Sequence, residues 1–262
     1  MQGGIINIGG CLIKSEVEDW DMATWVTHLM IADSVVKKFP FLCRHEFWVG
    51  NIAPDCNVEN EDWTAFTPSR EVTHWMQNDR KVASDCERFL REYVEKIECL
   101  DECKESFLLG YYAHLIVDAE FQRFIRDIDR VKAVWDRIKQ HPDLKDKIAG
   151  MDENWHSAKM LINGRERMKD IYSLEKEYLD LNPESGYLTD ILKLKYFPDY
   201  IDYLPEGAIV RKVKVMGYIP QKEDSLYPYI AMSKEEFYEF VECATKLVTE
   251  AIDKYWKNKN RM

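Results

Sequence analysis

Residues 104–126 form the segment that most constrains the fold, because they predict a long buried helix. The segment contains the run GYYAHLIVDAEF and is apolar around much of its circumference, as expected of a core helix. Two polar residues, His114 and Asp118, interrupt it four positions apart and so share one face of the helix. Burial of both groups is costly unless each is fully hydrogen-bonded or binds a metal ion. The pair is therefore either a buried hydrogen-bonded pair or part of a metal site.

Helical patterns also dominate the rest of the chain. Thr24 stands as an N-cap before an apolar stripe of helical spacing that ends at Pro40, and residues 83–100 carry a further helical pattern. The clearest element begins at Ser233, which forms a capping box with Glu236 ahead of a long apolar stripe. The sequence therefore predicts an all-α fold, a compact multi-helix bundle.

One segment departs from the helical pattern. Residues 208–220, AIVRKVKVMGYIP, alternate in polarity and are rich in β-branched side chains. This pattern favours extended structure, so we expect one small hairpin or extended arm near 208–220.

A single helical domain over residues 22–262 is the expected organisation. Residues 1–21 show little periodicity and are expected to be an N-terminal extension, with Met22 as an alternative start. The N-terminal region lacks the basic and apolar regions of a secretory signal, and no apolar run is long enough to span a membrane. Seven cysteines without regular spacing indicate reduced thiols. These features together predict a cytoplasmic protein.

The net charge of −11 limits the classes of partner. An acidic chain without a basic tract argues against binding to duplex nucleic acid, and against docking to an anionic membrane by charge alone. It does not exclude a small phosphorylated substrate, because bound metal ions would supply the positive charge.

Five polar residues stand in apolar or loop segments where their chemistry suits a metal site. They are His28, Asp55, His74, His114 and Asp118. Three imidazoles and two carboxylates are suited to zinc or a similar divalent ion, and the two oxygens of Asp118 would allow it to bridge two ions. Each residue also has a simpler reading. A lone histidine on an apolar face is more often a satisfied core residue, and an aspartate after a proline is usually a turn residue.

The local strings around these residues resemble a known family. THLMIAD, GNIAPD, THW and GYYAHLIVD occur in the order expected of the zinc-dependent phospholipase C family, whose superfamily includes single-strand nucleases with a trinuclear zinc site. The resemblance is closer still to a bacterial branch of that family that lacks a signal peptide, in which NEDWxxFTP is also typical. It covers the chain from about Trp25 to Trp256 and implies a compact bundle of α-helices.

The resemblance implies a role for each of the five residues. Asp55, His74, His114 and Asp118 match the ligands of one zinc ion. His28 matches a ligand of a second zinc ion, with Asp118 as the bridge. Asp55 also matches the residue that orients or deprotonates the attacking water, so it is the predicted catalytic residue.

The sequence departs from the family at its other ligands. Secreted members use an amino-terminal tryptophan on the second zinc, and Trp25 is near but is not an amino terminus. At the third site, Phe124 stands about where a histidine is expected, and His156 lacks a glutamate four residues later. Asp170 and Glu175 are possible replacement carboxylates, with a solvated helix face as the alternative reading. We therefore expect one or two zinc ions, with the third site absent or rebuilt.

Other polar and aromatic residues carry weaker signals. Asp62 is a candidate to orient a ligand histidine by a hydrogen bond, without binding the metal itself. Trp63 and Phe66 lie between two ligand segments and would either line a substrate cleft or anchor the loop. His45 and His141 lie among charged or turn residues and are expected to be exposed.

The predicted function is a metal-dependent phosphoester hydrolase that resembles phospholipase C and acts on a small phosphodiester or phosphomonoester. The alternative is a non-catalytic helical protein in which one structural zinc is held by a closed set of four ligands. A helical phosphohydrolase of the His-Asp type would need an adjacent His-Asp pair, and the sequence has none.

Overall fold

Helices account for most of the structure. The computed structural model describes residues 6–8, 11–13, 22–76, 84–96 and 101–260. Its α-helices are α1 (Trp25–Val36), α2 (Arg44–Gly50), α3 (Arg70–Thr73), α4 (Cys86–Phe89), α5 (Glu102–Ile125), α6 (Ile128–Gln140), α7 (Trp155–Leu161), α8 (Gly164–Leu181), α9 (Gly186–Thr189), α10 (Ala208–Met216) and α11 (Lys234–Lys259). Short 3₁₀ turns are η1 (Ala53–Asp55), η3 (Lys145–Lys147) and η4 (Ile191–Lys193), and η2 (Leu90–Glu95) is a π-helical turn.

Strands are confined to two short antiparallel hairpins among the described residues. β1 (Ile6–Ile8) pairs with β2 (Cys11–Ile13), and β3 (Val58–Glu59) pairs with β4 (Phe66–Thr67). The prediction of an all-α fold is therefore confirmed.

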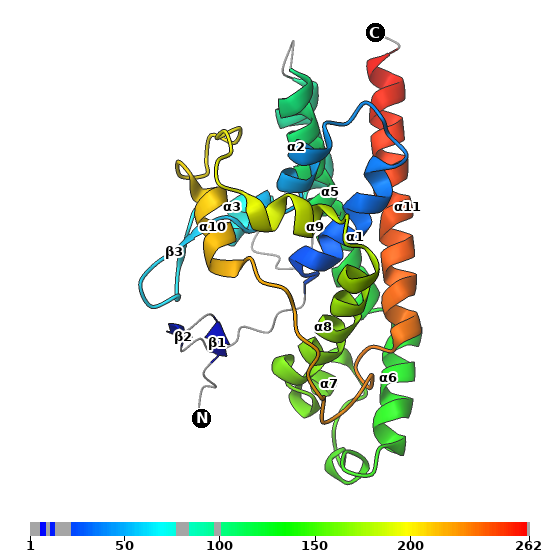
Figure 1. The fold of residues 1–262 in the computed structure, drawn as a ribbon. Coiled ribbons are helices and arrows are strands. Elements are labelled where there is room, and N and C mark those ends of the chain that lie inside the picture. Colours follow the sequence, from blue (N-terminus) through cyan, green and yellow to red (C-terminus); the bar gives the residue numbers. More distant parts are fainter. Residues whose placement is uncertain (1–5, 9–10, 14–21, 77–83, 97–100, 261–262) are drawn as a thin grey trace.

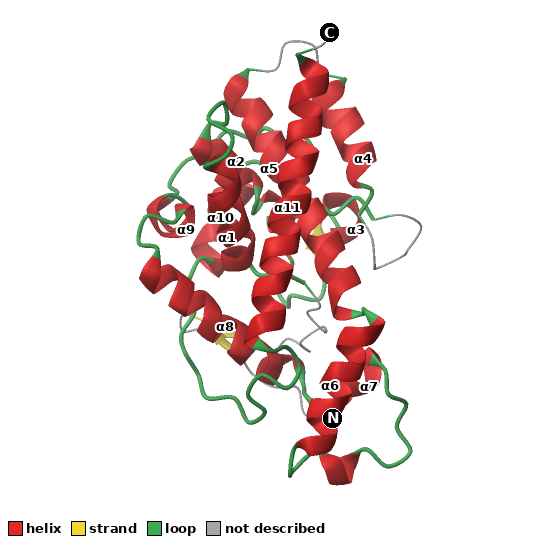
Figure 2. Ribbon diagram, turned by 90° about the vertical axis from the view of Figure 1, so that its right-hand side faces the viewer, coloured by secondary structure: helices red, strands yellow, loops and turns green. Residues whose placement is uncertain are grey.

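The predicted central helix is α5, around which the other long helices are arranged. It packs against α1, α2 and α11, and α1 also packs against α11 (Figure 1). The view in Figure 2 shows α11 running along α5, with α6 and α7 at the lower end of the bundle. Side chains such as Leu29, Phe47, Phe107 and Phe240 are fully buried between these helices. The core thus surrounds the face of α5 that carries His114.

Two glycines bring α2 and α5 unusually close together. A Cβ atom at Gly50 would lie 2.1 Å from the carbonyl oxygen of Phe107, and one at Gly110 would lie 2.2 Å from that of Phe47. No other residue type fits at either position without a shift of one backbone against the other. This contact places Asn51, the residue after α2, beside His114.

The caps that were predicted from the sequence are present. Thr24 accepts a hydrogen bond from the backbone of Thr27 at the start of α1. Ser233 and Glu236 form the capping box at the start of α11. These side chains satisfy backbone N–H groups that have no partner inside the helix, which fixes where each helix begins.

The prediction of an extended arm near 208–220 is wrong, because residues 208–216 form helix α10. Ala208, Ile209, Lys212 and Val213 are buried, a spacing that places them on one helical face. Burial of this face outweighs the preference of the β-branched residues for extended structure. The helix predicted over 83–100 is α4 followed by the π-helical turn η2, and residues 83 and 97–100 lie outside the described residues.

Within the described part of the chain, no helix combines the length and the apolarity needed to cross a membrane.

Candidate metal centre

Four separate elements bring the five predicted ligands together. His28 comes from α1, Asp55 from η1, and His74 caps the C-terminal end of α3. His114 and Asp118 come from α5, on the face that points toward α1 and α2. The three imidazoles and Asp118 are buried, whereas Asp55 is partly exposed. We call this set the five-residue cluster.

Four atoms of the cluster are spaced as the ligands of one ion would be. Nε2 of His74 lies 3.2 Å from Oδ1 of Asp55 and 3.3 Å from Nε2 of His114. Oδ2 of Asp118 lies 3.5 Å from Nε2 of His74 and 3.7 Å from Nε2 of His114. Nitrogen and oxygen ligands bind zinc at about 2.0–2.2 Å, so the edges of a tetrahedral site measure about 3.3–3.6 Å. The separations in the cluster fit such a site.

The second oxygen of Asp118 faces a different partner. Its Oδ1 atom lies 3.4 Å from Nε2 of His28, at an orientation that is not that of a hydrogen bond. Both ring nitrogens of His28 and Oδ1 of Asp118 are buried without a hydrogen-bond partner. Buried polar atoms without a partner are rare and call for an explanation, such as an ion between them. The two oxygens of Asp118 thus face different imidazoles. Oδ2 faces His74 and His114, whereas Oδ1 faces His28.

Hydrogen bonds on the far side of two rings aim the remaining nitrogens inward. Nδ1 of His114 lies 2.7 Å from the carbonyl oxygen of Asn51, which can only accept, so this nitrogen carries the proton. Nδ1 of His74 lies 2.9 Å from the hydroxyl of Thr73, which also contacts the carbonyl of Arg70. In the neutral ring of His114, Nε2 then presents a lone pair to the cluster. A ring held in this way is the usual arrangement of a metal-binding histidine.

The electrostatics of the cluster favour a neutral ring at His114 and ionised carboxylates at Asp55 and Asp118. Burial, together with the nearby ring of His28, lowers the pKa of His114 to about 3. Burial alone would raise the pKa of Asp55 and of Asp118, but His114, a second cluster histidine and Arg70 together hold both below the ordinary value. A neutral imidazole and an ionised carboxylate are the forms that bind a metal ion.

Arg70 and Trp25 contact the cluster and were not predicted as site residues. The guanidinium of Arg70 lies 3.0 Å from Oδ2 of Asp118 and 3.7 Å from Oδ1 of Asp55. The indole of Trp25 donates a hydrogen bond of 3.0 Å to Oδ2 of Asp55. Trp25 thus holds a carboxylate of the site through its ring nitrogen. The position of Arg70 four residues before His74, in SREVTHW, was the only sequence signal for it.

The weaker ligand candidates Asp62, His156 and Asp170 lie outside the five-residue cluster. Asp62 is exposed and accepts hydrogen bonds from Thr64 within its own turn. His156 is exposed on α7. Asp170 accepts from the backbone of Tyr229, and burial raises its pKa to about 6.

Glu175 is buried but supports a helix end. Oε1 accepts from the backbone N–H and the hydroxyl of Thr27, at 3.0 and 2.6 Å, and from the hydroxyl of Thr24. It therefore supports the start of the helix that carries His28. Phe124, which stands where the family has a third-site histidine, packs against Phe240 in the core.

The remaining predicted residues have identifiable contacts. The rings of Trp63 and Phe66 pack edge to face with their centroids 6.3 Å apart, and the ammonium of Lys212 lies over both rings. His45 is partly exposed and lies 2.8 Å from Asp190. His141 is half-buried rather than exposed, because its ring packs against Tyr227.

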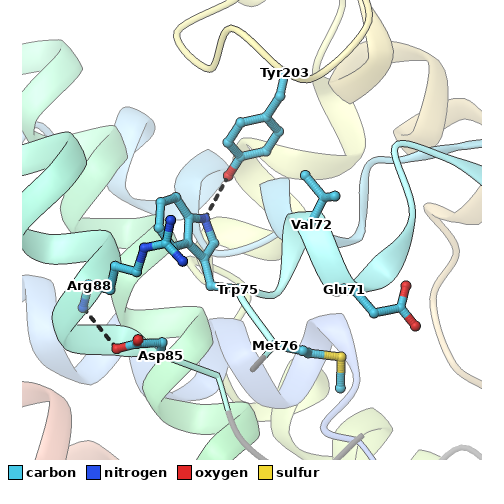
Figure 3. A pocket seen from close by; sticks show the side chains of 7 residues that line it. All are labelled: Glu71, Val72, Trp75, Met76, Asp85, Arg88 and Tyr203. Carbon is cyan, nitrogen blue, oxygen red and sulfur yellow. Dashed lines mark hydrogen bonds between the residues drawn. The ribbon is translucent and has the colours of Figure 1, made fainter. Parts of the chain in front are cut away.

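A pocket of about 570 Å³ opens beside the segment that carries His74 (Figure 3). Its lining residues are Glu71, Val72, Trp75, Met76, Asp85, Arg88 and Tyr203. The indole of Trp75 donates to the hydroxyl of Tyr203, which donates to Tyr111, which donates to the carbonyl of Thr73. One chain of hydrogen bonds therefore connects the pocket wall to the residue that holds His74.

The fold and the cluster together define a helical protein with a candidate metal centre buried between α1 and α5. Residues 27–120 match the sequence model of the family described as zinc dependent phospholipase C. Over this segment the match agrees with the resemblance seen in the sequence strings, and it supports membership of the zinc-dependent phospholipase C family. The matched segment contains all five residues of the cluster. No curated protein and no solved structure matches the chain.

Proposed function

We propose that this protein is a zinc-dependent phosphoester hydrolase with two zinc ions bound by the five-residue cluster. The observation that carries the proposal is the divided carboxylate of Asp118. Oδ2 faces His74 and His114, whereas Oδ1 faces His28 and has no hydrogen-bond partner. A carboxylate that presents its two oxygens to two sets of nitrogen ligands is suited to bridge two ions.

The residues divide between two positions. Asp55, His74, His114 and Oδ2 of Asp118 would hold the first ion, and His28 with Oδ1 of Asp118 would hold the second. Nδ1 of His114 is engaged by Asn51, so its ring has a single nitrogen to offer and serves one ion only. When bound, zinc supplies Lewis-acid activation of a water molecule and of the phosphoryl group.

Asp55 is the residue we propose to orient the attacking water and to accept its proton. Its side chain is 16% exposed, more than those of His74, Asp118 and the fully buried His28 and His114. It is thus the member of the cluster best placed to meet a molecule from solvent. Trp25 fixes the orientation of this carboxylate by its hydrogen bond to Oδ2.

Arg70 is the residue we propose to bind the phosphoryl group. Its side chain is 31% exposed, and its guanidinium stands at the solvent side of Asp55 and Asp118. A guanidinium binds phosphate oxygens in a two-pronged geometry. With zinc neutralising the two carboxylates, Arg70 becomes available to a substrate.

We propose a small phosphodiester or phosphomonoester as substrate. The net charge of −11 opposes binding of a polynucleotide, and the positive groups at this site are few. The adjoining pocket of about 570 Å³ has room for a small molecule, and Trp75 and Arg88 would provide an aromatic face and a positive charge.

A second candidate function is a structural zinc site without catalysis. The burial of His74, His114 and Asp118 favours this reading, because a closed set of four ligands leaves no position for a substrate. Activity and metal content together distinguish the two functions.

The test is the variant Asp55→Asn, assayed on phosphomonoesters, phosphodiesters and phosphocholine esters with added zinc. The amide keeps an oxygen for the ion but cannot accept a proton. We expect metal to be largely retained while kcat falls by about 10²–10⁴, the usual contribution of a general base. His45→Gln is the matched control and should keep both activity and metal. No turnover by the wild type on the whole panel, with one tightly held ion, would replace the hydrolase by the structural zinc site.

A further inference from the structure

A second group of potential metal ligands lies where α2 and α5 begin. It consists of Cys43, Glu46 and Cys103, whose ligand atoms lie within 4.8 Å of one another. All three are half-buried, and the two thiols come from positions 60 residues apart in the chain. None of the three belongs to the five-residue cluster.

One backbone contact between the start of α2 and α5 holds the two thiols close together. Cys43 is the N-cap residue of α2, and its side chain makes no capping hydrogen bond. Its backbone N–H donates to the hydroxyl of Ser106 on α5, at 2.9 Å. Cys103 lies in the first turn of α5. The backbones therefore hold the two sulfur atoms near each other, and neither thiol is needed to cap its helix.

The spacing of the sulfur atoms fits a zinc ion. The two Sγ atoms lie 3.6 Å apart, far beyond the length of a disulfide bond of about 2.05 Å. Thiolates bind zinc at about 2.3 Å, which in a tetrahedral site separates two sulfur atoms by about 3.8 Å. The separation of the two thiols is therefore compatible with chelation of one ion by both sulfur atoms.

The charges around the thiols also favour a cation. A carboxylate oxygen of Glu46 lies within 4.8 Å of both sulfur atoms and adds a negative charge to the group. A thiolate here would face a second thiol and a carboxylate, a repulsion that a divalent cation removes. His45, the nearest imidazole in the sequence, contacts Asp190 instead.

We propose that Cys43, Glu46 and Cys103 form a second metal site that binds zinc or a similarly thiophilic divalent ion. Two thiolates and one carboxylate leave the fourth position of a tetrahedral ion to water, so the ion is exchangeable. The site also bears on the five-residue cluster, because Cys43 is the N-cap of α2 and Asn51, the residue after α2, orients His114. An ion at this site links the start of α2 to the start of α5.

The test is titration of the reduced, full-length protein with Co²⁺, followed by the charge-transfer absorption that only thiolate ligands give. We expect saturable absorption in the wild type, its loss in Cys43→Ser and in Cys103→Ser, and weaker binding in Glu46→Gln. Cys243→Ser is the matched control, because Cys243 is a half-buried thiol beside the carboxylate of Glu120 and belongs to no candidate metal-ligand group among the described residues. It should leave the absorption unchanged.

The readout separates this site from the proposed hydrolase. The five-residue cluster has only nitrogen and oxygen ligands, so His114→Ala should keep the thiolate absorption even as it loses metal elsewhere. Absence of the absorption in the reduced wild type would overturn the proposal. Its persistence in both cysteine variants, or its loss in Cys243→Ser, would do the same.

Discussion

At the scale of single residues, the sequence identified the five residues of the cluster but not the groups that hold them. The strings around His28, Asp55, His74 and the pair on α5 were sufficient to name the five residues that the structure brings together. Their roles as ligands remain a prediction. The sequence did not identify Arg70 and Trp25 as site residues, because their contacts form only when α1 and α3 pack against η1 and α5. No local spacing encodes such contacts.

His114→Ala tests the cluster at its centre. The change removes one imidazole from the first set and leaves Asp118 buried with fewer partners. We expect loss of bound metal and a decrease of about 3–5 kcal/mol in the free energy of unfolding, because the buried charge of Asp118 loses one of its partners. Elemental analysis and thermal unfolding measure the two effects. His45→Ala should change neither, and normal metal content with an unchanged melting temperature in His114→Ala would reject the site.

At the scale of elements, helix positions followed from the sequence where caps and apolar stripes agreed. Helices α5 and α11 lie where the patterns placed them, because Asp101 and Ser233 satisfy the first backbone N–H groups of each. Helix α10 was missed because its β-branched residues favour extended structure locally, and only its buried face overrides that preference. The prediction failed at a segment where local propensity and burial disagree.

The contact of α2 with α5 predicts the effect of Gly110→Ala. The added methyl group would meet the carbonyl oxygen of Phe47 at 2.2 Å, so the two helices must separate. We expect a loss of about 1–3 kcal/mol in unfolding free energy and weaker metal binding, because Asn51 moves away from His114. Denaturant unfolding and zinc titration measure both. Lys104→Ala, on the half-buried first turn of α5, is the control, and equal stability of the two variants would contradict the close contact.

The contact of α8 with α1 predicts a pH dependence through Glu175. Burial raises the pKa of this carboxyl to about 8, above the ordinary value of about 4.3 that it has in the unfolded chain. Because the folded pKa is the higher one, the stability from this group is complete at low pH. It is lost as pH rises toward 8, by up to about 1.4 kcal/mol per pH unit.

Glu175→Gln isolates this contribution. The amide oxygen can still accept from Thr27, but the side chain no longer titrates. The stability of the variant relative to the wild type should therefore increase between pH 5 and pH 8, as measured by urea unfolding at each pH. Parallel stability curves for the two proteins would show that Glu175 ionises normally.

At the scale of the whole molecule, we propose that residues 22–262 form one domain. Helix α1, near the start of this range, packs against α11 at its end, and both pack against α5. The sequence predicted this bundle, and the family resemblance grouped the five residues at one site. Neither gave the packing of α1, η1, α3 and α5 that brings them together, because long-range contacts set it.

Removal of metal should destabilise the whole bundle rather than one helix. The proposed ligands come from α1, η1, α5 and the end of α3, so only the folded chain brings them together. A ligand that binds only the folded state at 100 times its Kd stabilises it by about 2.7 kcal/mol. We expect a chelator to lower the Tm and added zinc to restore it. A Tm that does not respond to either treatment would argue against a metal centre in the core.

The most direct measurement is the number of zinc ions per chain in two matched variants. Both carry Cys103→Ser, so that the thiol group does not contribute, and one also carries His28→Ala. Because Asp118 is divided between His28 and the other imidazoles, elemental analysis should find two ions in the first variant and one in the second. A single ion in both variants, or none in either, would contradict the two-zinc centre.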